Sequence, residues 1–186
     1  MENYALPILL FWGSKNEVKT ELCNFCLKSG ILCPSCQKKI RTGAISETDL
    51  KIARLLLSLE ETYLPLQDIY FKKAIEANNI LALVVGKGDV PHLLSHGGKI
   101  IKDLGKKIGK RIRVLEDGVD HRKFLEDLFA PLTIITINTI WIPDGTTETR
   151  VILKKRGRKY PLTNVEGLKK IAKELQGITL RVEFAD

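Results

Sequence analysis

All four cysteines of this 186-residue chain lie in one short segment, CNFCLKSGILCPSC. They are Cys23, Cys26, Cys33 and Cys36, with the spacing Cys-x2-Cys-x6-Cys-x2-Cys. Each Cys-x2-Cys turn can direct two sulfurs toward one point, and two such turns supply the tetrahedral thiolate set that zinc prefers. Because four thiolates leave no open coordination position, the spacing predicts one structural Zn²⁺ that helps this small segment to fold.

Two alternative interpretations of the four cysteines, disulfides and an iron–sulfur cluster, agree less well with their spacing. Disulfides fit poorly, because every cysteine lies in one segment and none is left to crosslink the rest of the chain. An iron–sulfur cluster can also use four thiolates, but the spacing differs from the common ferredoxin pattern.

His92 and His96 form a His-x3-His pair that could also bind a metal. The pair lacks the intervening glutamate and the third ligand of a zinc protease, so we interpret it as coincidental.

A double glycine stands directly before a lysine-rich helical pattern in the stretch LLSHGGKIIKDLGKKIGKRIRV. Glycines at a helix start leave the backbone amides open, and such amides attract phosphate oxygens. Lysines along the same helix would neutralise further phosphates, so the pattern predicts a site for single-stranded RNA. The residues predicted to contact RNA here are Ser95, His96, Gly97, Gly98, Lys99, Lys102, Lys106, Lys110 and Arg111.

A second basic run, KKRGRK, is either another RNA contact or a solvated surface turn. Its candidate RNA-binding residues are Lys154, Lys155, Arg156 and Arg158. The net charge of +8 agrees with a polyanionic partner, and we expect nucleic acid rather than a membrane surface. A hydrophobic content of 44% and a charged content of 28% are ordinary for a folded domain and argue against large-scale disorder.

The chain contains no apolar run of the ~18 residues that a membrane helix needs. The most hydrophobic patch near its start, LPILLFW, lacks the basic leader and cleavage site of a signal peptide. We therefore expect a cytoplasmic protein without a membrane partner.

The elements that must position these residues follow one order twice. Ser46 to Asp49 resembles a capping box and predicts a helix that ends near Tyr63. In the glycine-led helix, the predicted core stripe is Ile101, Leu104 and Ile108. The predicted helices cover 46–63, 91–94, 99–108, 121–131 and 164–177, and the predicted strands cover 69–75, 80–85, 111–116, 132–142, 147–155 and 178–184. The order helix–strand–strand–helix–strand, repeated twice, predicts an α+β fold with two related modules.

The first copy resembles a KH module, in which an I-G-x-x-G loop precedes a helix that ends in L-G-K and a strand rich in Val and Ile. Gly98 stands eleven residues before Gly109, as in that family, and Ser95 replaces the first loop glycine. In the second copy the loop would fall at Thr163, Asn164, Val165 and Glu166, where there is no glycine and the glutamate would repel phosphate. We expect this second loop to have lost its RNA contact.

Two helix-first (type II) KH modules in tandem resemble the archaeal NusA-like transcription factor family, and FLEDLFAP is similar to that family's join between modules. The resemblance runs from Ser46 to Phe184. The expected organisation is an N-terminal extension (1–20), zinc knuckles or a zinc ribbon (21–44), a first KH module (45–117) and a second, degenerate KH module (118–186). The resemblance implies an RNA-binding factor of transcription elongation or termination, with single-stranded RNA and RNA polymerase as partners.

Three other functions are the alternatives to this one. A ribosome-associated KH and zinc-ribbon protein would keep the RNA but would have a ribosomal subunit as its partner. A purely protein-binding scaffold would not bind RNA at all. An enzyme is not expected, because the cysteines are assigned to metal and no histidine has an evident nucleophile or paired carboxylate.

Overall fold

The computed structural model describes residues 17–154 and 164–185. A first group of elements comprises α3 (Glu47–Leu59), the 3₁₀ helix η1 (Leu64–Asp68), β2 (Tyr70–Ala77), β3 (Ile80–Val85), α4 (Val90–Ile108) and β4 (Arg111–Glu116). A second group comprises α5 (His121–Phe129), β5 (Ile134–Trp141), β6 (Thr147–Lys154), α6 (Val165–Gln176) and β7 (Leu180–Ala185). The predicted order helix–strand–strand–helix–strand is confirmed in both groups.

The two groups also share their strand pairing. In the first sheet β3 lies between β2, to which it is antiparallel, and β4, to which it is parallel. In the second sheet β6 lies in the same way between β5 and β7. A two-residue strand, β1 (Lys19–Thr20), extends the first sheet by pairing in parallel with β2.

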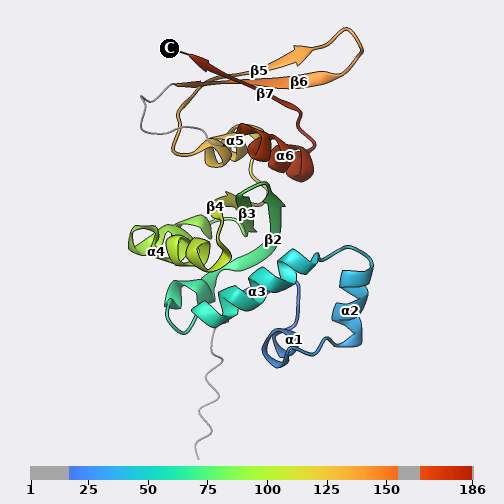
Figure 1. The fold of residues 1–186 in the computed structure, drawn as a ribbon, viewed down its shortest axis with the longest axis vertical. Coiled ribbons are helices and arrows are strands. Elements are labelled where there is room, and N and C mark those ends of the chain that lie inside the picture. The colour runs from blue at the N-terminus through green and yellow to red at the C-terminus, as the bar shows by residue number, and fades with distance from the viewer. Residues whose placement is uncertain (1–16, 155–163, 186) are drawn as a thin grey trace, which may run out of the picture.

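The elements stack in four layers along the long axis of the molecule (Figure 1). Helices α3 and α4 cover one face of the first sheet, α5 and α6 lie between the two sheets, and the second sheet forms the far end. In β3, Leu81, Leu83 and Val85 pack toward α3 and α4, whereas the alternating residues of β3 pack toward α5 and α6. All six residues of β3 are buried, which explains its continuous apolar run.

Helix α3 begins at the predicted capping box. The Ser46 hydroxyl accepts from the Asp49 backbone N–H, and the Asp49 carboxylate accepts from the Ser46 backbone N–H. The buried Asp49 also accepts a hydrogen bond from the Ala74 backbone N–H, which ties α3 to β2. The helix ends at Leu59, earlier than the predicted end near Tyr63, because the chain turns there and continues into the Pro65-containing η1.

The core stripe of α4 is shifted from the prediction. Ile100 and Leu104 are fully buried, whereas Ile101 and Ile108 are only partly buried. The prediction was therefore right for Leu104 and missed Ile100, because periodicity alone does not fix how a helix is rotated against its sheet.

The cysteine segment, predicted as zinc knuckles or a zinc ribbon, contains two short helices. Helices α1 (Asn24–Ser29) and α2 (Pro34–Arg41) each begin directly after a cysteine, Cys23 or Cys33, that acts as the N-cap residue with extended backbone. Pro34 at the first helical position favours the start of α2. Cys26, Leu27 and Cys36 join the core beneath α3, so the segment packs onto the first group.

None of the helices in residues 17–154 and 164–185 is long and apolar enough to cross a bilayer. The apolar patch LPILLFW lies outside the described residues, as do Lys155, Arg156 and Arg158 of the predicted second RNA surface.

Candidate nucleic-acid interface and metal centre

Helix α4 is interrupted at the predicted loop. Ser95 has extended backbone angles (φ −56°, ψ 164°), and His96, Gly97 and Gly98 are left-handed, with φ of 53°, 66° and 72°. The helix–loop–helix arrangement is thus confirmed. Since Ser95 does not need a positive φ, serine fits this position without strain. The non-glycine residue with a strained, left-handed backbone in this loop is His96.

The main chain of this loop faces open space. A Cβ atom built on Gly97 or Gly98 would meet no other atom within 4 Å. The glycines are therefore required by their left-handed backbone and not by internal crowding. A side chain added at either position would project into that open space.

His96 has a defined hydrogen-bond partner within the loop. The Ser95 hydroxyl donates to the His92 carbonyl oxygen at 2.7 Å and lies 3.0 Å from His96 Nδ1. Because the hydroxyl proton is used on His92, Nδ1 of His96 must carry the proton that joins it to Ser95. Nε2 of the exposed His96 then remains available to a ligand.

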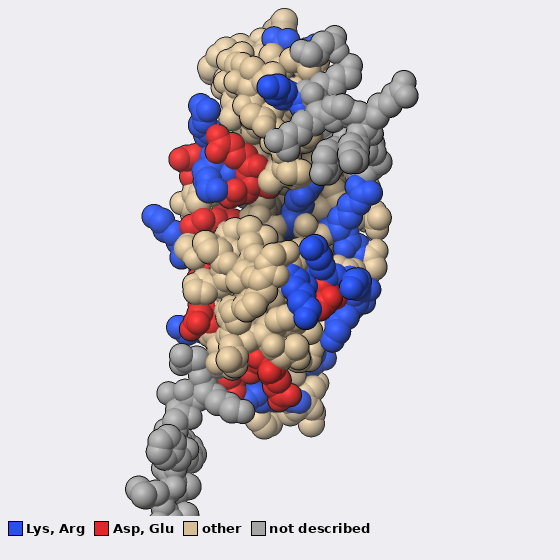
Figure 2. All heavy atoms as spheres, turned by 90° about the vertical axis from the view of Figure 1, so that its left-hand side faces the viewer, with Lys and Arg blue, Asp and Glu red and all other residues tan. Residues whose placement is uncertain are grey.

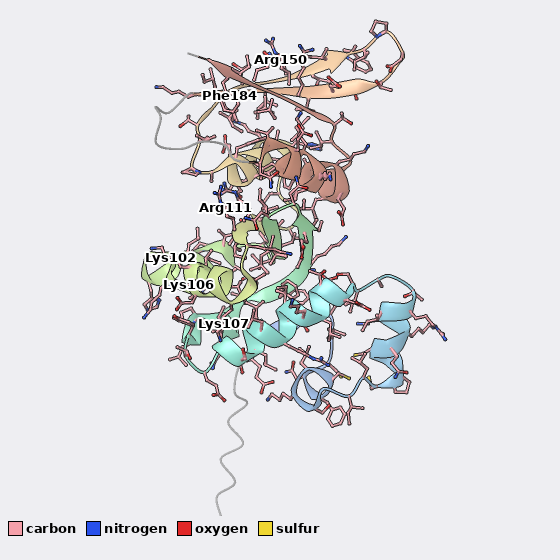
Figure 3. All side chains as sticks on the ribbon, in the orientation of Figure 1. Lys102, Lys106, Lys107, Arg111, Arg150 and Phe184 are labelled. Atoms are coloured by element: carbon pink, nitrogen blue, oxygen red, sulfur yellow. The ribbon has the colours of Figure 1, made fainter. Side chains whose placement is uncertain are left out.

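The second half of α4 presents four exposed lysines, Lys99, Lys102, Lys106 and Lys107. Lys102 donates to the Gly97 carbonyl oxygen at 3.3 Å. Figure 2 shows Lys and Arg side chains gathered on the face that carries α4, and Figure 3 shows Lys102, Lys106 and Lys107 projecting from this part of the molecule. The predicted residue Lys110 is instead partly buried and ion-paired with Glu76 of β2.

The acidic residue within this basic helix, Asp103, is engaged by neighbours. The Tyr63 hydroxyl donates to its carboxylate, and Lys106 lies 3.5 Å from it. The pKa of Asp103 is lowered, first by the Tyr63 hydrogen bond and then by Lys106. Asp103 therefore stays ionised at neutral pH, with its charge held by these partners, and the lysines dominate the outer face of α4.

Arg111 follows α4 at the start of β4 and is exposed. With Asn79, Ile80 and Asn164 it lines a cavity of ≈350 Å³ between the two groups of elements. Lys154 is exposed at the end of β6, in the second sheet. The structure thus brings residues 95–111 together along one helix and the following strand, whereas Lys154 belongs to a separate part of the molecule.

The start of α6 differs from its counterpart in α4. Val165 and Glu166 belong to the first turn of α6, which corrects the prediction that they form a loop, and Thr163 lies outside the described residues. Asn164 caps the helix through its side-chain oxygen. A Cβ on Gly167 would lie 3.0 Å from the Ala77 carbonyl oxygen of the first group, so this helix start packs against protein instead of facing solvent.

The four cysteine sulfurs converge on one point. Cys23, Cys26, Cys33 and Cys36 have their Sγ atoms within 4.8 Å of one another. Cys23 Sγ lies 3.1 Å from that of Cys26, 4.0 Å from that of Cys33 and 3.8 Å from that of Cys36. Zinc–sulfur bonds of about 2.3 Å in a tetrahedron separate the sulfurs by about 3.8 Å, so this donor set fits Zn²⁺.

The surroundings of the cluster act differently on its thiols: the pKa of Cys26 and of Cys36 is raised, whereas that of Cys33 is lowered. The Cys33 backbone N–H donates to Cys26 Sγ at 3.0 Å, a contact that stabilises negative charge on this sulfur. The pKa of the Cys33 thiol is lowered to about 7, first by the Cys36 backbone N–H and then by the Cys26 thiol. Since the thiolate is the form that binds metal, Cys33 is prepared for this role near neutral pH.

Comparison with known proteins found similarity over part of the chain. No known family model matches it. A probable transcription termination protein NusA of Methanocaldococcus jannaschii is 34% identical over 62 residues, which cover 33% of this chain and 32% of that protein. A protein of the same description from Methanococcus vannielii is 31% identical over 62 residues, covering 33% of this chain and 34% of that protein. The chain thus matches about a third of the length of these curated relatives.

A search of solved structures found the crystal structure of APE1850. It aligns with a TM-score of 0.49 and 21% sequence identity, and the alignment covers 76% of this chain and 100% of that one.

Proposed function

We propose that this chain is a non-catalytic protein that binds single-stranded RNA, with the loop from Ser95 to Gly98 as its main contact. The observation that carries the proposal is the open space over Gly97 and Gly98 at the start of a lysine-bearing helix. A phosphate can approach these amides directly, and Lys99, Lys102 and Lys106 can neutralise the next phosphates of the strand.

Each group of elements corresponds to a type II KH module in this proposal. The order of helices and strands and the parallel pairing of the last strand support it in both groups. The first module grips a few nucleotides of RNA. The second acts as a rigid support, because the start of its own helix α6 packs on the first module at Ala77 and so is closed to a strand of RNA.

One structural Zn²⁺ completes the proposal. Cys23, Cys26, Cys33 and Cys36 would hold it, and with four protein ligands it would supply folding energy and no catalysis. The helices α1 and α2 would then present a fixed surface beside α3 for a protein partner.

The setting we propose is transcription elongation or termination, with RNA polymerase as a protein partner. The partial similarity to two archaeal proteins described as probable transcription termination protein NusA supports it. Crosslinking in cells followed by RNA sequencing tests the setting. Enrichment of nascent messenger RNA agrees with transcription, whereas enrichment of ribosomal RNA would move the protein to the ribosome.

RNA binding itself is tested with Gly98→Asp. An aspartate here adds a bulky negative charge where we propose that phosphate binds, so affinity for single-stranded RNA should fall below detection while the circular dichroism spectrum stays unchanged. Gly43→Asp is the matched control, because Gly43 (φ +74°) has nearly the same backbone angle as Gly98 (φ +72°), equal open space and a location at the end of α2.

Equal RNA affinity in the Gly98→Asp variant and the wild-type protein would refute the assigned loop. Binding that is lost to the same degree in Gly43→Asp would show that backbone strain, and not the loop surface, is responsible.

A further inference from the structure

Arg113 of β4 is a cation without a counter-charge. Its Nε atom is buried and has no hydrogen-bond partner, and the residue makes no ion pair with any residue in the described part of the chain. Burial lowers the pKa of Arg113, and the adjacent charge of Arg111 lowers it further. Two other cations on the strands have carboxylate partners: Lys73 pairs with Glu174, and Arg150 pairs with Glu183.

The strand register shows which way Arg113 points. Arg111 pairs with Ile80 and Arg113 with Ala82, and both of these β3 residues belong to the core that faces α5 and α6. Since side chains alternate along a strand, Arg111 and Arg113 share the face of β4 that turns toward the second group. Among the described strands β4 is the outer one of its sheet, so this arginine pair lies at the edge of that sheet.

The neighbouring cavity has the chemistry of an anion site. Its described lining consists of Asn79, Ile80, Arg111 and Asn164, which offer two amides and a guanidinium but no carboxylate. Figure 3 shows Arg111 at the boundary between the two groups of elements, directly beyond α4. The planar guanidinium group of Arg111 suits phosphate oxygens well, and the asparagine side-chain amides can donate to them.

We propose that Arg111 and Arg113 bind a backbone phosphate of the same RNA strand that the loop binds at Gly97 and Gly98. The stretch of α4 from Lys99 to Ile108 rises about 15 Å, so several nucleotides separate the two contacts and lie along the lysines of that helix. The phosphate supplies the counter-charge that Arg113 lacks. This inference rests on the proposed RNA binding and extends its site into the boundary between the two groups.

The test compares RNA length. Fluorescence anisotropy measures the affinity of the full chain for single-stranded oligonucleotides of about four nucleotides, the length that a KH-type loop clamps, and of about twelve. Arg113→Met should bind the long oligonucleotide about tenfold more weakly, as expected for a lost charged contact, and the short one with unchanged affinity. Unchanged short-oligonucleotide binding also shows that the variant is folded.

Two further variants sharpen this comparison. Arg181→Met removes one arginine from the second sheet, where Arg181 pairs with Glu183, so it controls for the change in net charge. Arg113→Lys keeps the charge and should keep most of the dependence of long-oligonucleotide affinity on salt, whereas Arg113→Met should reduce that slope by about 0.7.

The outcomes separate this inference from the function on which it rests. If Arg113→Met binds the long oligonucleotide like the wild-type protein, or weakens both lengths equally, the distant phosphate contact is wrong while RNA binding at the loop stands. If the wild-type protein binds neither length, the proposed function fails and this inference fails with it.

Discussion

The side-chain amide nitrogen of Asn78 donates a 2.8 Å hydrogen bond to the side-chain oxygen of Asn164. Asn78 lies in the turn between β2 and β3, and Asn164 caps α6. The same Asn164 oxygen accepts from the Gly167 backbone N–H at 3.0 Å. The start of α6 in the second group is thus covered by residues of the first group. The corresponding loop in α4 of the first group, at Gly97 and Gly98, instead faces open space.

Substitution of Gly167 tests how closely this helix start packs. A Cβ at this position would lie 3.0 Å from the Ala77 carbonyl oxygen. Although alanine normally stabilises a helix relative to glycine, we expect Gly167→Ala to lower the free energy of unfolding by about 1–3 kcal/mol because of overpacking. Urea denaturation measures the change, and Lys170→Ala, at an exposed position of the same helix, is the control. A Gly167→Ala variant more stable than the wild-type protein would contradict this close packing.

The elements with strong local signals could be predicted from the sequence. The apolar run of β3 and the capping box at Ser46 gave clear bounds, and the observed strands β3 and β4 match the predicted ranges. The cysteine spacing predicted a cluster that the structure confirms, because two Cys-x2-Cys turns determine most of its geometry locally. The left-handed backbone at Gly97 and Gly98 likewise follows from the residue type.

Features set by contacts between distant elements could not be predicted. The rotation of α4 that buries Ile100 depends on the sheet beneath it, and the closed start of α6 depends on the turn at Asn78. The unpaired Arg113 was missed because the sequence RIRVLE gives the ordinary alternation of a half-exposed strand. Only the packing of α5 and α6 against the first sheet makes this position unusual.

The lysines of α4 should make RNA binding sensitive to salt. If the loop and helix neutralise about four to six phosphates, affinity should fall roughly ten- to a thousandfold from low to moderate salt. Replacing Lys99, Lys102 and Lys106 with glutamine should reduce the slope of log affinity against log salt by about 2, since each contact with a single strand contributes about 0.7. Filter binding over a salt series measures both effects. A wild-type affinity that does not change with salt would exclude α4 as the contact surface.

The cysteine cluster predicts one zinc ion per chain by elemental analysis. Cys26 and Cys36 are buried in the core beneath α3, so metal loss should destabilise the first group as well as α1 and α2. Loss of a structural metal can exceed about 4 kcal/mol, which corresponds to a fall in Tm of roughly 10 °C for a chain of this size. Cys36→Ser and chelator treatment should lower Tm alike, whereas Ser35→Ala, in the same helix, should not. Two zinc ions per chain, or none, would refute the four-thiolate site.

The contact between Tyr63 and Asp103 predicts a pH dependence of stability. The Tyr63 hydrogen bond lowers the pKa of Asp103, so its stabilising effect is complete above the unfolded pKa of about 3.9 and is lost as pH falls through the lower folded value. The pKa of Tyr63 is raised, first by the hydrogen bond to Asp103, so on the alkaline side the effect is lost only as pH rises past about 10.

Tyr63→Phe should therefore have a lower Tm than the wild-type protein at pH 7, and the two values should converge as the pH falls below about 4. Thermal unfolding from acidic to neutral pH measures the difference. In an Asp103→Asn background the carboxylate is gone, so Tyr63→Phe should have an effect that no longer varies with pH over this range. If the Tm difference between the tyrosine and phenylalanine proteins keeps the same pH dependence in that background, a group other than Asp103 is responsible for it.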